Sequence, residues 1–134
     1  MPASPYLSNQ LRAHVLRTAT FAKPTVIGIS LHTADPGSTG ANEVSGGAYA
    51  RATLNPLDAN WAGAIDGRSS NLVVVTFPAP TGADWGTATH FGIWDAGAGG
   101  NFYIGAPLTP VVPIHNGDPA PSFAVGVLVV VFNH

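Results

Sequence analysis

The sequence predicts an all-β domain, an antiparallel β-sandwich or barrel of about seven strands with one α-helix in front of them. Three observations predict it. Short apolar runs, several rich in β-branched residues, recur about every 10–20 residues. Sixteen Gly and twelve Pro punctuate these runs as turns. Charged residues make up 9% of the 134 residues, with one Lys and one Glu, which excludes a long coiled coil.

The only helical pattern lies near the N-terminus, over about residues 5–19. Ser4 is suited to cap it, and Pro5 fits the first helical position because an N–H there would lack a partner. Apolar residues then recur along one face: Leu7, Leu11, Val15 and Ala19, with Leu16 beside them. An isolated helix of this length is unstable in water. We therefore expect this stripe to dock on one end of the sheet or on a neighbouring subunit.

The strands are predicted from Pro24 onward. They cover residues 26–31, 48–54, 72–77, 87–94, 102–106, 108–114 and 122–132. The Gly-rich turn at 95–100 joins two of them as a hairpin. Pro110 and Pro113 mark their run as an edge strand. The last run is the most apolar, so we expect it to be central and covered on both faces.

Two long loops, 32–47 and 55–70, are candidates for subunit contacts, because long loops are uncommon unless they are functional. Tyr49 and Arg51 lie between them. One interpretation places this pair at the centre of an interface, where Tyr and Arg contribute strongly to binding. In the other, Arg51 holds one of the loops within the subunit through an Asp. No linker or composition break divides the chain, so residues 1–134 are expected to form one domain.

The residues predict no catalytic, metal or cofactor site. The carboxylates fall in predicted turns or strand ends, where Asp bonds nearby backbone N–H groups: Asp35, Glu43, Asp58, Asp66, Asp84, Asp95 and Asp118. A pair of them serving glycoside cleavage is the weaker interpretation. The five His show no metal-ligand spacing, so we expect His90 to be a hydrogen-bonded strand residue. The absence of Cys excludes thiol catalysis.

The charge pattern bears on partners. Basic residues are few and scattered, which argues against nucleic-acid binding. No apolar stretch reaches the roughly 18–20 residues that a membrane span needs. A free monomer usually carries more surface charge for solubility. We therefore expect much of the surface to be covered by other subunits.

Aromatic residues suggest either a carbohydrate-stacking face or a core and interface role. They are Trp61, Trp85 and Trp94 with Tyr49, Phe91 and Tyr103. The core and interface role is favoured, because aromatic side chains contribute most of their energy through buried area. Trp61 and Trp85 accordingly join Tyr49 and Arg51 as candidate interface residues.

Short motifs keep their order and spacing over nearly the whole chain. They are YLSNQL at 6–11 with His14, SLHTADPG at 30–37, GANEV at 40–44, GGAYAR at 46–51, WGT at 85–87 with THF at 89–91, and GGN at 99–101. Together they resemble a family of small tailed-bacteriophage virion proteins usually labelled tail-fibre proteins. The resemblance supplies no catalytic residues and implies a structural virion protein. Similar small β proteins are capsid decoration subunits, commonly trimers.

These observations predict a non-enzymatic surface subunit of a phage particle, of the decoration, minor-capsid or tail-fibre type. The expected partners are copies of itself, with a homotrimer as one candidate, and virion proteins such as major capsid or tail proteins. The alternative function is a host-glycan receptor-binding module that uses exposed Trp side chains.

Overall fold

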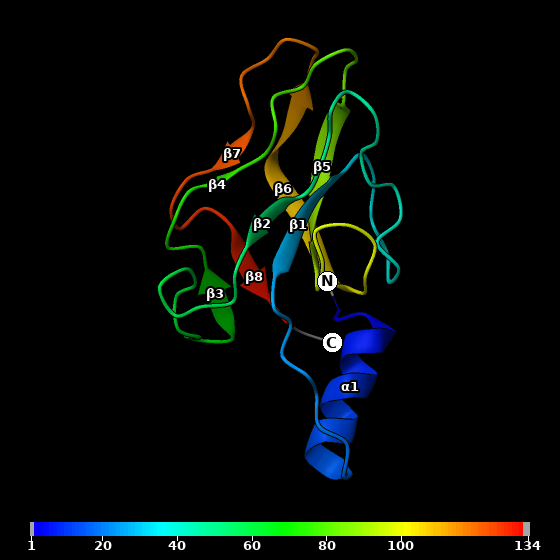
Figure 1. Ribbon diagram of the computed structural model, residues 1–134, viewed down its shortest axis with the longest axis vertical. Helices are drawn as coiled ribbons and strands as arrows, with labels where there is room; N and C mark the ends of the chain where they lie inside the picture. The colour runs from blue at the N-terminus through cyan, green and yellow to red at the C-terminus, as the bar shows by residue number, and fades with distance from the viewer. Residues whose placement is uncertain (1, 133–134) are drawn as a thin grey trace.

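The computed structural model describes residues 2–132 and confirms the mostly β, antiparallel prediction (Figure 1). Within these residues the sheets form a sandwich-like arrangement and no closed barrel. The elements are α1 (Pro5–Leu16), β1 (Ile27–His32), β2 (Ala52–Leu54), β3 (Arg68–Ser70), β4 (Val75–Thr76), β5 (Gly86–Trp94), β6 (Phe102–Ile114), β7 (Ser122–Phe123) and β8 (Val129–Val131).

The main sheet has four strands in the order β2-β1-β5-β6, all antiparallel to their neighbours. The predicted hairpin is β5–β6, and β6 lies at the sheet edge, as its prolines indicate. The two strands predicted at 102–106 and 108–114 form one strand instead. Its pairing slips where Ala88 faces Val112 but His90 faces Pro107, so the Pro-containing segment continues as an irregular edge.

The two faces of the main sheet are covered differently. On one face Ile29 and Ile93 pair across β1 and β5, and Phe91 contacts Phe123 with ring centroids 6.2 Å apart. This face packs on a second layer of two small sheets, β3-β8 and β4-β7. On the other face the loop at 33–45 lies over the sheet. Gly40 in that loop has φ +78 and abuts the Trp94 ring, so any Cβ there would overlap it.

The prediction of a central, fully covered strand at 122–132 is wrong. The segment divides into β7 and β8, which pair with the short strands β4 and β3. A turn separates them, with Gly126 at φ +79 and Val127 N–H bonded to Ala124 O at 3.0 Å. The Val residues of this turn are exposed, at 55% for Val125 and 61% for Val127.

Asn71 holds the second layer together and is fully buried. Its Nδ2 donates to Val73 O at 2.8 Å and to Ala124 O at 3.0 Å, and its Oδ1 accepts from Leu128 N–H at 3.0 Å. The hydrogen bonds of this amide therefore replace the backbone hydrogen bonds that a continuous last strand would have made. It also explains why strand pairing in this layer is brief: the run predicted at 72–77 is regular only in β4.

Two other boundaries differ from prediction. The strand predicted at 48–54 is regular only in β2, because Ala48 adopts φ +63 in the preceding turn. Strand β3 lies inside the loop predicted at 55–70. Its sequence, Arg-Ser-Ser, carries no apolar alternation, and only its pairing with β8 makes it a strand.

Helix α1 ends earlier than predicted, and only its first turn packs against the sheets. Ser4 caps it by accepting from Leu7 N–H at 3.2 Å, as expected, but Arg17 is extended at φ −132, ψ −172. The first turn packs on β6: Leu7 is buried, and Tyr6 stacks on Tyr103 with centroids 6.2 Å apart. The rest of the helix projects from the end of the sheets (Figure 1). Its predicted apolar stripe is therefore mostly uncovered by its own chain.

Candidate functional site

Arg51 is the centre of a buried polar cluster. Its Nε and Nη2 donate to the two carboxylate oxygens of Glu43, each at 2.9 Å. Its Nη1 donates to Ala96 O at 3.1 Å and to Gly99 O at 2.7 Å. The guanidinium also lies 3.7 Å from the centroid of the Trp94 ring. A planar, multidentate cation on an aromatic face is an arrangement that Lys cannot reproduce.

This geometry decides how Arg51 acts within the subunit. The side chain holds the 33–45 loop through Glu43 and the β5–β6 turn through two carbonyls. One interpretation of the sequence was that Arg51 holds a loop within the subunit through an Asp. The structure agrees on the Arg and the loop, but the acidic partner is Glu43. Arg51 is largely buried in this contact. Its role in contacts between subunits stays a prediction.

Tyr49 and Trp85 extend the cluster. The Tyr49 hydroxyl donates to Glu43 Oε2 at 2.7 Å and accepts from Leu31 N–H at 3.1 Å. Its ring meets that of Trp85 edge-on, with centroids 5.1 Å apart, and Trp85 Nε1 donates to Gly47 O at 2.7 Å. Burial raises the pKa of Tyr49, so the hydroxyl stays a donor at neutral pH. Burial would also raise the pKa of Glu43, but the hydrogen bonds from Arg51 and Tyr49 lower it below its usual value.

His32 also holds the 33–45 loop. Sequence reasoning did not select it as a site residue. Trp94 Nε1 donates to Ser30 Oγ at 2.8 Å, Ser30 Oγ lies 2.6 Å from His32 Nε2, and His32 Nδ1 lies 2.7 Å from Ala41 O. A carbonyl can only accept, so Nδ1 carries the proton and Nε2 accepts from Ser30. Burial lowers the pKa of His32, which keeps the ring neutral.

Most of the motifs noted in the sequence converge on this cluster, whereas YLSNQL lies apart from it on α1. SLHTADPG contributes Ser30 and His32, GANEV contributes Glu43, and GGAYAR contributes Tyr49 and Arg51. WGT and GGN reach it through a ring and a backbone carbonyl. The motifs therefore specify how two loops are fixed to the sheet. The position of His32 within SLHTADPG was the available sequence signal for it.

Other candidate residues have structural surroundings. His90 Nδ1 lies 2.8 Å from Thr89 Oγ1, which confirms a hydrogen-bonded strand His. Asp35 Oδ1 accepts from Gly37 N–H at 2.8 Å and Asp95 Oδ1 from Asn101 N–H at 2.7 Å, as expected for turn carboxylates. Among residues 2–132, no group of three or more His, Cys, Asp or Glu could hold a metal ion.

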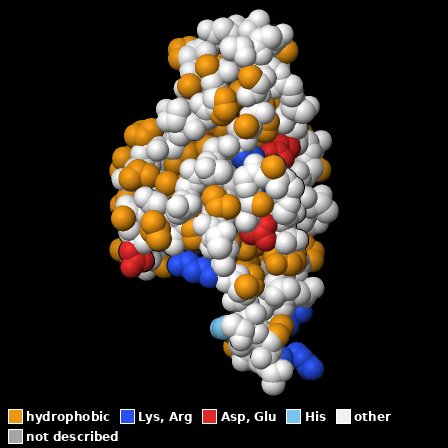
Figure 2. Space-filling model, in the orientation of Figure 1, with side chains coloured by type: hydrophobic (Ala, Val, Ile, Leu, Met, Phe, Trp, Pro, Cys, Tyr) orange, Lys and Arg blue, Asp and Glu red, His pale blue; other side chains and the backbone are white. Residues whose placement is uncertain are grey.

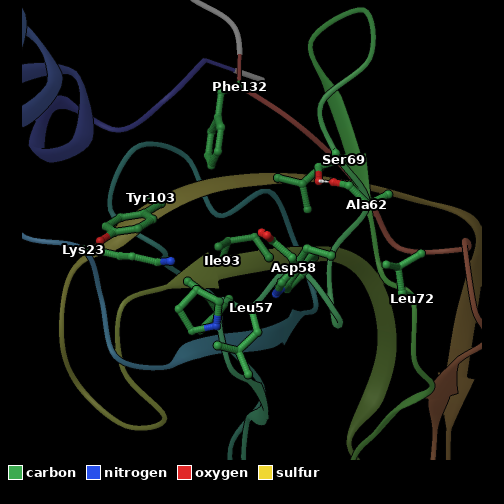
Figure 3. A pocket seen from close by; sticks show the side chains of 14 residues that line it. Lys23, Leu57, Asp58, Ala62, Ser69, Leu72, Ile93, Tyr103 and Phe132 are labelled. Atoms are coloured by element: carbon green, nitrogen blue, oxygen red, sulfur yellow. Dashed lines mark hydrogen bonds between the residues drawn. The ribbon is translucent and has the colours of Figure 1, made fainter.

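Trp61 lies apart from this cluster, on a cavity of about 610 Å³ between the main sheet and the β3–β8 pair (Figure 3). Leu57, Leu72, Tyr103 and Phe132 surround the hollow, and Lys23, Asp58 and Ser69 supply its polar atoms. Trp61 therefore lines a predominantly apolar cavity, while its Nε1 is a buried donor without a partner.

A family model described as podophage GP4 fiber I protein gp80 matches residues 2–131. The chain belongs to this family. No curated protein matches the sequence. As a member of a phage fibre family the protein is a structural component of the virion, which confirms the resemblance drawn from the motifs. Within the described part of this fibre-family protein, no helix combines the length and apolar character needed to cross a bilayer.

Proposed function

We propose that this fibre-family protein is a non-enzymatic surface subunit of the particle. It associates with copies of itself and docks on other virion proteins, as a decoration, minor-capsid or tail-fibre-type subunit. Family membership supports the virion role. The finer role is supported by the character of the surface.

The observation that carries the proposal is an exposed apolar patch on the second layer, defined by Val73, Val74, Val125, Val127 and Val129. Hydrogen bonds from Asn71 place the two segments that hold these residues side by side. Figure 2 shows apolar side chains gathered over the part of the molecule that holds β3 and β4, on the left of the view. A contiguous apolar patch of this kind marks an interaction surface. Because charged residues make up only 9% of the chain, few charged side chains are present to keep the patch soluble.

The surroundings of the acidic residues support a role without catalysis. Glu43 is engaged by Arg51 and Tyr49, and four Asp side chains bond turn backbone, whereas Asp58 lines the cavity; the four are Asp35, Asp84, Asp95 and Asp118. A general acid or base needs a carboxyl group free to reach a substrate. Binding to other proteins requires only a complementary shape and exposed apolar area, and the valine patch provides such area.

The test is to place charges on the patch. We expect the wild-type protein to be an oligomer by light scattering, and V125D/V127D to lose that association or its attachment to particles that lack the subunit. S38D/A120D adds the same charge at exposed positions elsewhere and should behave as wild type. Electron microscopy of the particle then gives the position and copy number. A wild-type protein that stays monomeric and is absent from purified particles would overturn the proposal.

The glycan-binding alternative depends on exposed aromatic rings. Trp85 and Trp94 are 4% and 8% exposed, so neither ring offers a face to a sugar. Only Trp61, at the cavity, stays available for that role. If the protein bound host polysaccharide and W61A abolished that binding while leaving virion attachment intact, the receptor-binding function would gain priority over the structural one.

A further inference from the structure

Helix α1 carries an apolar face that its own chain does not cover. Leu11 is 42% exposed, and Val15 and Leu16 are each 74% exposed. These three residues and Arg12 lie at i, i+1, i+4 and i+5 and so share one side of the helix. The first turn is fixed to β6 through Ser4 and Leu7. Because only the first turn is anchored, the rest of the helix extends beyond the end of the sheets (Figure 1), and this face has nothing of its own chain to pack on.

The formal charge divides sharply along the chain. Residues 2–34 hold Arg12, Arg17 and Lys23 and no acidic residue, which gives +3. Residues 35–132 hold all seven acidic residues and only Arg51 and Arg68, which gives −5. Arg12 and Arg17 make the projecting segment positive, whereas the β body stays negative even with Lys23, which lines its cavity. Such a division attracts the helix of one molecule to the body of another.

The body offers an apolar receptor at the same end of the molecule. The cavity beside Trp61 lies between the main sheet and β3–β8, and Tyr103, which stacks on Tyr6 of α1, lines its edge. Leu57 and Phe132 on its rim are 55% and 52% exposed. The Trp61 side chain lines the same cavity, which is predominantly apolar.

From these three observations we propose that α1 of one copy docks in the cavity of a second copy, through Leu11, Val15 and Leu16. The inference rests on the self-association proposed above and adds to it a second contact beside the valine patch. Because helix and cavity lie at one end of the molecule, two copies can exchange helices reciprocally, or several can do so around a closed ring. The cavity is lined by one acidic and one basic side chain, Asp58 and Lys23, and Asp58 gives the incoming Arg12 an opposite charge.

Disulfide trapping tests the contact directly, because the chain contains no Cys. V15C and L57C, made separately and mixed under mild oxidation, are expected to give a covalent dimer on a non-reducing gel. Both positions are exposed, so neither substitution threatens the fold. V15C mixed with V125C is the matched control, since Val125 lies on the valine patch, and should stay uncrosslinked. A V15C–V125C product in place of the V15C–L57C product would overturn the cavity assignment.

Association measured by sedimentation provides the second arm. V15D/L16D should weaken self-association by at least about 100-fold, since charges replace the apolar centre of the contact, with unchanged circular dichroism and Tm. Persistence of the wild-type oligomer in V15D/L16D would overturn the helix exchange while leaving self-association through the valine patch in place. An unchanged oligomer that no longer attaches to particles would also overturn it, because α1 would then bind a different virion protein. A wild-type monomer at every concentration would remove the proposed self-association itself.

Discussion

At the scale of single residues, loss of the Arg51 side chain leaves several polar groups without a hydrogen-bond partner. Truncation removes two bonds to Glu43 and two to loop carbonyls, and leaves a half-buried carboxylate without its cation. We expect R51A to lower the free energy of unfolding by about 3 kcal/mol, and R51K to recover only part of it. Urea denaturation measures both. R17A, at an exposed position, is the control, and equal stability of R51A and R17A would contradict the clamp.

The pH dependence of stability follows from two lowered pKa values. The folded-state pKa of His32 lies below its usual 6.5 and that of Glu43 below its usual 4.5. For each group the unfolded state binds more protons, so stability is present above the ordinary pKa and is lost as pH falls toward the folded pKa. We expect stability to decline below about pH 6.5 through His32 and further below about pH 4.5 through Glu43.

Thermal unfolding across this range checks the assignment. H32N should flatten the upper part of the decline and E43Q the lower part, each at some cost in stability at neutral pH. H115N alters an exposed His and should leave the profile unchanged. A profile that H32N leaves as steep as wild type would contradict the role of His32.

At the scale of elements, Asn71 decides whether the second layer forms. Its side chain bonds both segments that β3, β4, β7 and β8 belong to, and the amide is fully buried, so water cannot take its place. We expect N71A to cost about 2–4 kcal/mol, because several buried polar groups lose their partner together. Hydrogen exchange should show the loss first in β7 and β8, while β1 and β5 keep their protection. N9A, on exposed helix surface, provides the comparison.

The elements that sequence reasoning predicted well are those set by local pattern. The apolar run of β1, the alternation of β5 and the Gly-rich turn before β6 need no distant partner to be recognised. The prediction for the last run was wrong because Val-rich sequence is typical of a buried strand, whereas Gly126 and the distant Asn71 divide it. Strand β3 exists only through pairing with β8. Sequence reasoning selected Tyr49, Arg51 and Trp85 of the cluster as candidate interface residues, a role that stays a prediction, whereas the placement of Glu43 and His32 depends on a loop folding back over the sheet.

At the scale of the whole molecule, the formal charge is +3 over residues 2–34 and −5 over residues 35–132. This separation predicts how the association rate of two copies depends on salt. Opposite charges on the helix of one copy and the body of another speed their encounter, and salt screens that attraction. We expect the association rate to fall as ionic strength rises from about 20 mM to about 300 mM, over which the Debye length shrinks severalfold.

Stopped-flow mixing of labelled protein, freshly diluted to monomer, measures this rate. R12Q/R17Q removes two of the three positive charges and should both slow association and flatten its dependence on salt, while the dissociation rate changes less. A T18Q/T20Q variant alters exposed neighbours without changing charge and should follow wild type. Because apolar contacts strengthen in concentrated kosmotropic salts, a rate that rises steadily with salt would point to the valine patch as the first contact, in place of the charged helix.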